Sequence, residues 1–211
     1  EAYFQIGNIG FESAIIDRIR NNNPDLKIFN TSDSIMLIIG THGECTAHGH
    51  SHELDPHTWS SVRNGKIIAA NMYKAMINMD PANEKTYTKN YSRLVAHLDS
   101  LDSRIDSMLS GRQGSAFMVW HPSLSYFARD YGLEQISIGV EGKEASVQRI
   151  QSKIDDAKRH NAKIFFAQKD FDSRQASVIS REIGAKIIDI NPLNYQWEDE
   201  LYGVAVALAS E

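Results

Sequence analysis

The sequence predicts an α/β protein of two lobes, each with a parallel sheet, joined by one long backbone helix. Short apolar segments alternate with helical segments over residues 111–211, and a weaker form of this alternation covers residues 1–80. An uninterrupted helical pattern at 81–110 lies between them. We therefore expect a partial N-terminal lobe, a linking helix and a C-terminal lobe with these boundaries.

The N-terminal lobe has few predicted strands. Residues 1–7 form an apolar segment typical of a short buried strand, and residues 12–23 carry a helical pattern. Two more apolar segments, 26–30 and 35–40, predict strands separated by a turn. We therefore expect an N-terminal lobe whose first part is missing. Because the chain opens without an initiator Met or a signal peptide, we expect a processed or truncated product.

Two long helices follow in the predicted order. Residues 60–79 have a serine-rich start that can cap a helix, and this helix should end near Asp80. Over 81–110, apolar residues recur at alternating steps of four and three, which predicts one helix roughly 45 Å long at ~1.5 Å per residue. The apolar positions are Tyr87, Tyr91, Leu94, Leu98, Leu101, Ile105 and Met108. The same stripe also fits a coiled-coil dimer, and this alternative stays open.

The C-terminal lobe is predicted from four strand and helix pairs. The expected strands are 116–120, 135–140, 163–168 and 186–190. The expected helices are 123–131, 145–160, 172–183 and 197–209. Four such pairs in under 100 residues predict a parallel sheet covered by helices.

The composition excludes several classes of protein. The 211 residues are 42% hydrophobic, enough for a substantial core, and 27 acidic against 22 basic residues give a net charge of −5 with no basic field for nucleic acid. No apolar run approaches the ~20 residues that span a bilayer. Cys45 is the single cysteine, which excludes an internal disulfide. Cys45 is interpreted either as a loop thiol without a role or as a metal ligand among neighbouring histidines.

Histidine is concentrated in one segment, since five of the eight histidines lie within residues 42–57. Neutral imidazole is the commonest protein ligand for first-row transition metals. In 55-DPHTW-59, Pro56 stiffens the approach to His57 and Trp59 can anchor the turn. Asp55 can accept a hydrogen bond from the far imidazole nitrogen and fix its tautomer. Considered alone, His57 is equally well explained as a capping histidine.

A second group of candidate ligands follows predicted strands. His121 comes directly after the strand 116–120, at the kind of carboxyl end where open α/β sheets bind ligands. A histidine bound only to backbone is the alternative. Asp189 and Asn191 occupy a similar place at the last strand and could complete a metal site.

The remaining histidines and acidic residues are weaker candidates. The segment 41–56 has little apolar content and should be a mobile, solvated loop that binds metal weakly or is an incidental linker. Its auxiliary ligands would be His42, His48, His50 and His52. Glu141 and Glu144 are acidic candidates, though each fits a helix N-terminal charge. His97 and His160 are expected on helix surfaces or in packing.

Known catalytic and nucleotide-binding motifs are missing. The chain contains no GxGxxG, GxxxxGK[ST], GxSxG or HExxH, and no nucleophile and base stand out as a pair. We therefore expect a protein that is not an enzyme.

Four features together resemble one family. The chain resembles the zinc-type periplasmic metal-binding proteins of bacterial ABC importers, the ZnuA/TroA-like solute-binding family, whose motifs occur in the same order. In this chain they are DPHTW, the long helix, 121-HPSLSYFARDYGL-133 and 189-DINPL-193. A histidine-rich loop just before DPHxW is a further mark of the family. The resemblance covers essentially the whole chain. It implies two α/β lobes joined by one long helix, with metal in the cleft between them.

The resemblance also implies a set of ligands. His57 and His121 match the family's two histidine positions, and an imidazole rather than a carboxylate at His121 favours Zn²⁺ over Mn²⁺. The family's C-lobe carboxylate falls on Asn191, with Asp189 two residues earlier, so this chain departs from the pattern there. The family's first histidine ligand lies upstream of YFQIG. We therefore expect two fixed ligands here and weak zinc binding.

The implied function is capture of Zn²⁺ outside the cytoplasmic membrane and delivery to a membrane permease, by a monomer in the periplasm that is either free or lipid-anchored. The histidine loop would collect zinc or sense its abundance. Two alternatives remain open. One is a metal-storing or cell-surface adhesion protein of the same fold, and the other is a zinc-dependent hydrolase.

Overall fold

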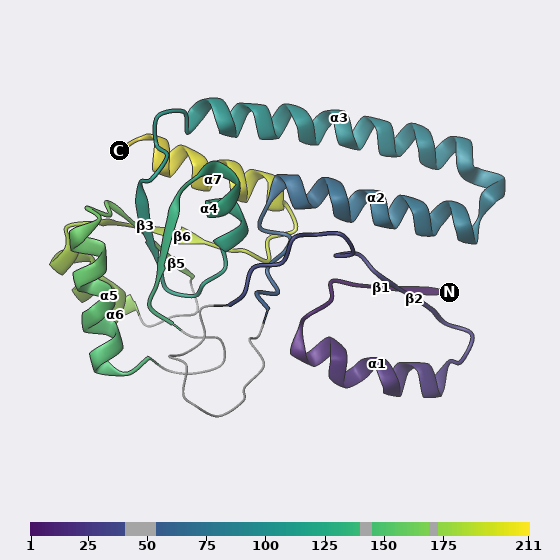
Figure 1. Cartoon of the computed structure of the whole chain (residues 1–211), viewed down its shortest axis with the longest axis horizontal. Helices are drawn as coiled ribbons and strands as arrows, with labels where there is room; N and C mark the ends of the chain where they lie inside the picture. Colours follow the sequence, from purple (N-terminus) through teal and green to yellow (C-terminus); the bar gives the residue numbers. More distant parts are fainter. Residues whose placement is uncertain (41–53, 140–144, 169–172) are drawn as a thin grey trace.

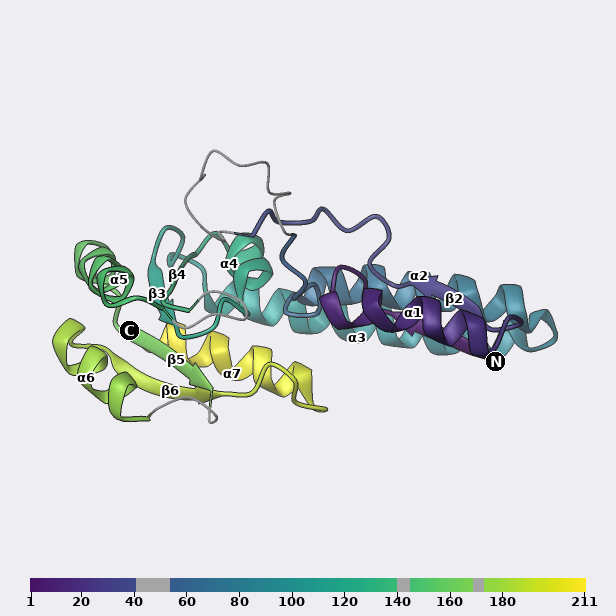
Figure 2. The same ribbon diagram turned by 90° about the horizontal axis from the view of Figure 1, so that it is seen from below.

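Two parallel sheets lie toward opposite ends of a pair of long antiparallel helices (Figures 1 and 2). The computed structural model of the chain describes residues 1–40, 54–139, 145–168 and 173–211. The larger sheet belongs to the second half of the chain and the smaller one to the first 30 residues. This is the two-lobe α/β arrangement that the sequence predicts.

The N-terminal unit consists of β1 (Ala2–Gln5), α1 (Gly10–Asn22) and β2 (Lys27–Asn30). The two strands pair in parallel, with Phe4 opposite Phe29. The carboxylate of Glu12 is buried at the start of α1 and accepts hydrogen bonds from the backbone N–H groups of Ile6 and Gly7. A buried carboxylate needs such donors, and these hold the turn between β1 and α1.

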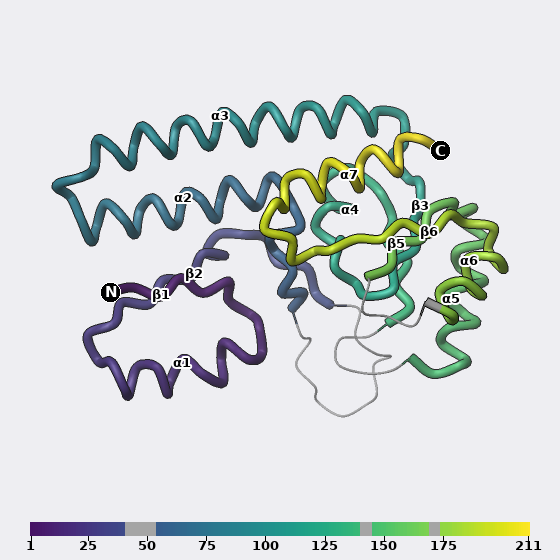
Figure 3. The backbone as a smooth tube through the Cα atoms, turned by 180° about the vertical axis from the view of Figure 1, so that it is seen from behind, coloured from purple at the N-terminus to yellow at the C-terminus, as the bar shows by residue number. Residues whose placement is uncertain are grey.

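The two long helices are α2 (Val62–Met79) and α3 (Glu84–Met108). Ser61 caps α2 by accepting a hydrogen bond from the Asn64 N–H at 2.9 Å, as expected for a serine at this position. The predicted helix 81–110 begins with a separate 3₁₀ turn, Pro81–Asn83, because proline suits a first turn and lacks an amide hydrogen. α3 packs along α2 and then along α7 (Trp197–Ala209), which Figure 3 shows from behind.

The C-terminal unit has a four-stranded parallel sheet in the order β4-β3-β5-β6. Its strands are β3 (Ala116–Val119), β4 (Glu134–Ser137), β5 (Ile164–Gln168) and β6 (Lys186–Ile190). Its other helices are α4 (Ser125–Tyr131), α5 (Val147–Arg159) and α6 (Ser173–Ile183). The alternation of short strands and helices seen in the sequence is thus confirmed.

Two hydrophobic cores cover the two faces of this sheet. Phe117 and Val119 of β3 pack in the core that includes α3, α4 and α7, while Met118 packs in the core that includes α5 and α6. Successive strand residues point to opposite faces, so a strand buried on both sides must be continuously apolar. This requirement explains the sequence AFMV in β3.

The segment 35–40 is not the strand that its apolar residues predict. Ile39 forms only an isolated antiparallel bridge with Leu54. The Ile38 N–H donates to the Tyr126 hydroxyl at 3.2 Å, and the Met36 carbonyl accepts from Arg129 at 2.8 Å. Side chains of α4 therefore satisfy backbone groups that a neighbouring strand would otherwise satisfy.

The C-terminal end of the predicted loop 41–56 is also different from the expectation. Asp55 and Pro56 are buried. The Asp55 backbone N–H bonds to the Ile38 carbonyl, and the Asp55 carbonyl accepts the hydroxyl of Tyr126 on α4. Residues 41–53, which include His42, His48, His50 and His52, lie outside the described residues. Within the part of the chain that the structure describes, no helix is long and apolar enough to cross a membrane.

Candidate metal centre

His57 and His121 face each other with their Nε2 atoms 3.0 Å apart. Their ring centroids lie 4.9 Å apart, and the ring planes meet at 78°. His121 follows β3. In the sheet order β4-β3-β5-β6, the chain continues from β3 to β4 on one side and to β5 and β6 on the other, so β3 marks the point where the strand order reverses. Ligands of open α/β sheets bind at such a switch point, beyond the carboxyl ends of the strands. The structure thus brings together the two histidines that the sequence singled out.

Asp55 orients the imidazole of His57. One carboxylate oxygen, Oδ1, lies 2.8 Å from His57 Nδ1 and accepts the backbone N–H of the same residue at 2.9 Å. A carboxylate accepts hydrogen bonds only, so we assign the ring proton to Nδ1 and a lone pair to Nε2. The contact between Asp55 and His57 that the sequence predicted is present.

The Asp55 carboxylate is stabilised in its charged form. Burial alone would raise the pKa of Asp55, but hydrogen bonds from the His57 ring and backbone and from Ser125 outweigh it and hold that pKa below its ordinary value. Asp55 and His57 are 5% and 7% exposed. An ionised carboxylate in this position increases the basicity of the imidazole that it holds.

The spacing of the two imidazoles suits a tetrahedral metal. Zinc binds histidine nitrogen at about 2.0–2.1 Å, so two nitrogens at a tetrahedral angle lie about 3.3 Å apart. The Nε2 atoms of His57 and His121 are already 3.0 Å apart. They need to separate by only a few tenths of an ångström to accept a common ion. Two imidazoles fit zinc, copper, iron and nickel better than manganese or magnesium.

The proposed ligands at β6 lie near the same edge of the sheet but are not gathered around the pair. Asp189 and Asn191 are both exposed, and Asn191 Oδ1 accepts the Leu193 N–H at 3.2 Å. Among residues 1–40, 54–139, 145–168 and 173–211, no three His, Cys, Asp or Glu side chains form a group that could hold a metal. Asp189 and Asn191 therefore stay predictions, as do Glu141 and Glu144, which lie outside the described residues.

Sequence reasoning missed the contribution of α4. The Tyr126 hydroxyl donates to the Asp55 carbonyl at 2.6 Å, and Arg129 Nη2 donates to Asn64 Oδ1 at 3.2 Å. Burial raises the pKa of the Tyr126 hydroxyl, which therefore remains a donor. The sequence signal was available, because a tyrosine in the apolar run after His121 needs a partner for its hydroxyl when buried.

A cavity of about 240 Å³ adjoins the pair on the Asp55 side. Its lining includes His57, Asp55, Ser125, Arg129 and Glu134. A larger groove of about 800 Å³ runs between α2, α3 and the start of α7, lined mostly by apolar side chains, and neither histidine contributes to it. The smaller cavity therefore borders the Asp55 side of His57, and His121 is not among its lining residues.

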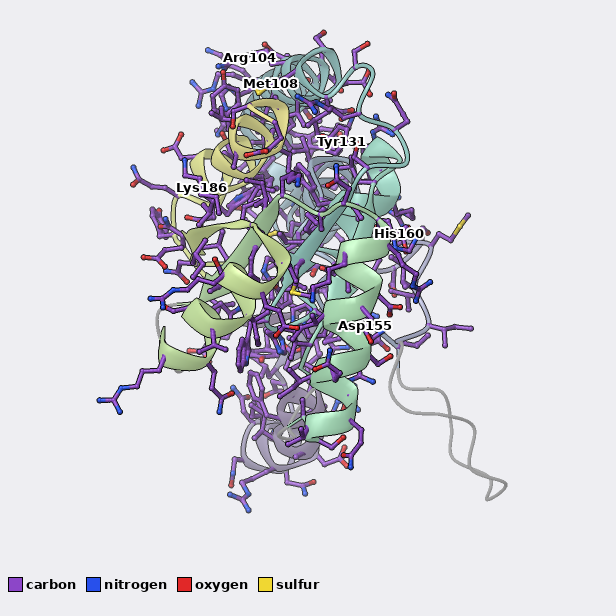
Figure 4. The ribbon with its side chains drawn as sticks, turned by 90° about the vertical axis from the view of Figure 1, so that its left-hand side faces the viewer. Arg104, Met108, Tyr131, Asp155, His160 and Lys186 are labelled. Atoms are coloured by element: carbon purple, nitrogen blue, oxygen red, sulfur yellow. The ribbon has the colours of Figure 1, made fainter. Side chains whose placement is uncertain are left out.

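The other two described histidines lie elsewhere. His97 is exposed on α3 with Nε2 2.5 Å from Glu198 Oε2. His160 is exposed at the end of α5, on the outer side of the C-terminal unit (Figure 4), with Nδ1 2.9 Å from the Asp156 carbonyl. Both are surface residues, as expected.

A histidine pair at the switch point of a parallel α/β lobe, with a second parallel unit joined through long helices, defines the class of metal-type solute-binding proteins. Comparison with known proteins gives the family. The chain belongs to the ZnuA family, the periplasmic component A of zinc-uptake complexes, whose sequence model matches residues 1–203. The resemblance inferred from the sequence motifs is thereby confirmed, and this family consists of binding proteins rather than enzymes.

Curated relatives agree with this assignment. The high-affinity zinc uptake system protein ZnuA of Bacillus subtilis is 31% identical over 148 residues, which cover 68% of this chain and 46% of the relative. The zinc-binding lipoprotein AdcA of Streptococcus pneumoniae (strain ATCC BAA-255 / R6) is 28% identical over 161 residues, covering 75% of this chain and 32% of the relative. The chain thus spans less than half the length of these two relatives.

Solved structures confirm the fold. A crystal structure of ZnuA superimposes with a TM-score of 0.86 at 32% identity, covering 100% of this chain and 78% of that chain. A zinc-bound ZnuA deletion mutant gives the same TM-score at 33% identity, covering 99% and 77%. A manganese-bound periplasmic protein of candidatus liberibacter asiaticus, at 19% identity, shares the fold with a TM-score of 0.83 over 99% of this chain and 80% of that chain.

Proposed function

We propose that this chain captures Zn²⁺ between its lobes and delivers it to the membrane permease of an ABC importer. His57 and His121 would bind the ion through their Nε2 atoms. The observation that carries the proposal is their separation of 3.0 Å, together with the Asp55 carboxylate that orients His57. Zinc is the cargo in this proposal, and the protein performs no chemistry on it.

The proposal extends to the rest of the ligand set and to the setting. Asp189 or Asn191 would supply a further oxygen from the loop after β6, and His42, His48, His50 and His52 would collect zinc with low affinity. The lobes would be residues 1–80 and 111–211, linked by 81–110. The protein would work as a monomer outside the cytoplasmic membrane, in keeping with the periplasmic description of its family.

Isothermal titration calorimetry of the purified chain with Zn²⁺ tests the site. We expect one site per chain, with binding weakened at least tenfold in His57→Ala and in His121→Ala. His160→Ala is the matched control because His160 is exposed at the C-terminal end of α5, and this variant should bind zinc like the wild type. Zinc binding that survives both substitutions in the pair would overturn the assignment.

Delivery to a permease needs a separate measurement. In proteoliposomes that contain the cognate ABC permease, the zinc-loaded chain should stimulate ATP hydrolysis, and the His57→Ala chain should not. A metal-storing or cell-surface protein would bind zinc and leave the ATPase rate unchanged. A zinc-dependent hydrolase would instead cleave ester or peptide substrates when zinc is added.

A further inference from the structure

Helix α4 begins four residues after His121, and its Tyr126 hydroxyl bonds to Asp55 in the segment that carries His57. We propose that Tyr126 and Arg129 on this helix are positioning residues for the zinc site, which hold His57 opposite His121. This inference rests on the proposed function. It concerns residues that act on His57 through other groups.

Tyr126 acts on His57 through Asp55. Its hydroxyl is fully buried, donates to the Asp55 carbonyl at 2.6 Å and accepts the Ile38 N–H at 3.2 Å. The Asp55 carboxylate in turn holds His57 Nδ1 at 2.8 Å. Because these buried groups are hydrogen-bonded one to the next, a shift of Asp55 relative to α4 would move the His57 ring relative to His121.

Arg129 holds the same segment at a second point. Its Nη1 donates to the Met36 carbonyl at 2.8 Å, and its Nη2 donates to Asn64 Oδ1 at 3.2 Å. The Asn64 side chain donates onward to the Thr58 carbonyl at 3.0 Å, directly after His57. The guanidinium also lies 5.0 Å from the Tyr126 ring centroid, so the two positioning residues support each other.

These contacts explain how two histidines 64 positions apart in the sequence come to lie at hydrogen-bond distance. Asp55 and Thr58, on either side of His57, are both tied to the helix that follows His121. Ligands held in this way need little rearrangement on binding, which increases affinity. Loosening the contacts should therefore weaken zinc binding even though every ligand is retained.

Tyr126→Phe is the most direct test, with Tyr131→Phe as its matched control. Both tyrosines lie on α4 and are buried, and each donates one hydrogen bond. The Tyr131 hydroxyl, however, donates to Asp102 on α3 at 2.9 Å rather than to the segment that carries His57. Outer contacts of metal sites typically change affinity 10–100-fold. We expect zinc binding about tenfold weaker in Tyr126→Phe and unchanged within twofold in Tyr131→Phe.

Zinc titration, thermal unfolding and the absorption spectrum of bound Co²⁺ should be measured for both variants and the wild type. Similar unfolding temperatures with weaker metal binding and an altered Co²⁺ spectrum only in Tyr126→Phe support positioning. Equal zinc affinities in the two variants overturn this inference while leaving the site intact, provided that His57→Ala still weakens binding at least tenfold. A wild-type chain that binds no zinc overturns both this inference and the proposed function.

A second variant keeps the test decisive if Tyr126→Phe does not fold. Arg129→Lys retains a positive charge beside Asp130 but lacks the planar fork that reaches Met36 and Asn64 together. We expect its zinc affinity to fall several-fold. Wild-type affinity in Arg129→Lys would count against the positioning role.

Discussion

The indole N–H of Trp59 donates to the carbonyl oxygen of Pro192 at 2.9 Å. This bond joins the DPHTW turn, which carries His57, to the loop after β6, which carries Asn191. The Trp59 ring also lies 5.3 Å from the His57 ring, measured between centroids. One side chain thus connects a proposed ligand of the pair to the segment proposed to complete the site.

Trp59→Phe should therefore weaken zinc binding while the turn remains packed. Phenylalanine preserves a ring beside His57 but cannot bond to the Pro192 carbonyl, which costs about 1 kcal/mol of stability. We expect zinc affinity to fall a few-fold by calorimetry. Trp197→Phe, in the core around α7, should lower stability without changing zinc affinity. Unchanged affinity in Trp59→Phe would show that the loop after β6 does not contribute to binding.

Asp55→Asn should weaken zinc binding about 10–100-fold, the usual effect of removing the partner of a ligating histidine. An amide can donate to His57 Nδ1 and so place the ring proton on Nε2, where the metal must bind. The control is Asp106→Asn, an exposed carboxylate on α3 that pairs with Arg63 at 3.3 Å. Calorimetric zinc titration of both variants checks the expectation, and equal affinities would contradict it.

Zinc binding should weaken on acidification, because imidazole must lose its proton before it can coordinate a metal. Asp55 does not cause this loss. Its lowered pKa keeps the carboxylate charged as pH falls, until pH reaches that lowered value. Titrations at about pH 7.5, 6.5 and 5.5 should show a steady fall in affinity and release of protons into the buffer. Binding independent of pH over this range would exclude histidine as the main ligand.

The sequence predicted the helices and strands better than the partners of their backbone hydrogen bonds. Strand β3, helix α2 and the C-terminal alternation follow from periodicity, because apolar spacing reflects burial directly. The segment 35–40 has the same apolar content but runs beside Tyr126 and Arg129, whose side chains take its backbone hydrogen bonds. Tertiary partners of this kind lie about 90 residues away and leave no mark in the local pattern.

The candidate site was predictable to a similar extent. His57, His121 and Asp55 stand in short motifs whose chemistry can be read locally, and the structure brings them together. The contributions of Tyr126 and Arg129 could not be inferred in this way, because they depend on how α4 packs against residues 36–38 and 55–64. Contacts between residues so far apart in the sequence can be identified only from the three-dimensional structure.

The apolar stripe on α3 gives a last prediction, because its two halves have different surroundings. Ile105 and Leu98 are 0% and 1% exposed in the core shared with α7, whereas Leu94, one turn before Leu98, is 41% exposed. Ile105→Ala should lower the free energy of unfolding by about 2–5 kcal/mol through lost burial and a cavity. Leu94→Ala should cost under about 1 kcal/mol, since less apolar surface leaves the interior. Urea denaturation of the metal-free chains measures both values. Equal losses would mean that α3 is buried uniformly in solution, as a coiled-coil dimer would bury it, and sedimentation equilibrium would then detect that dimer.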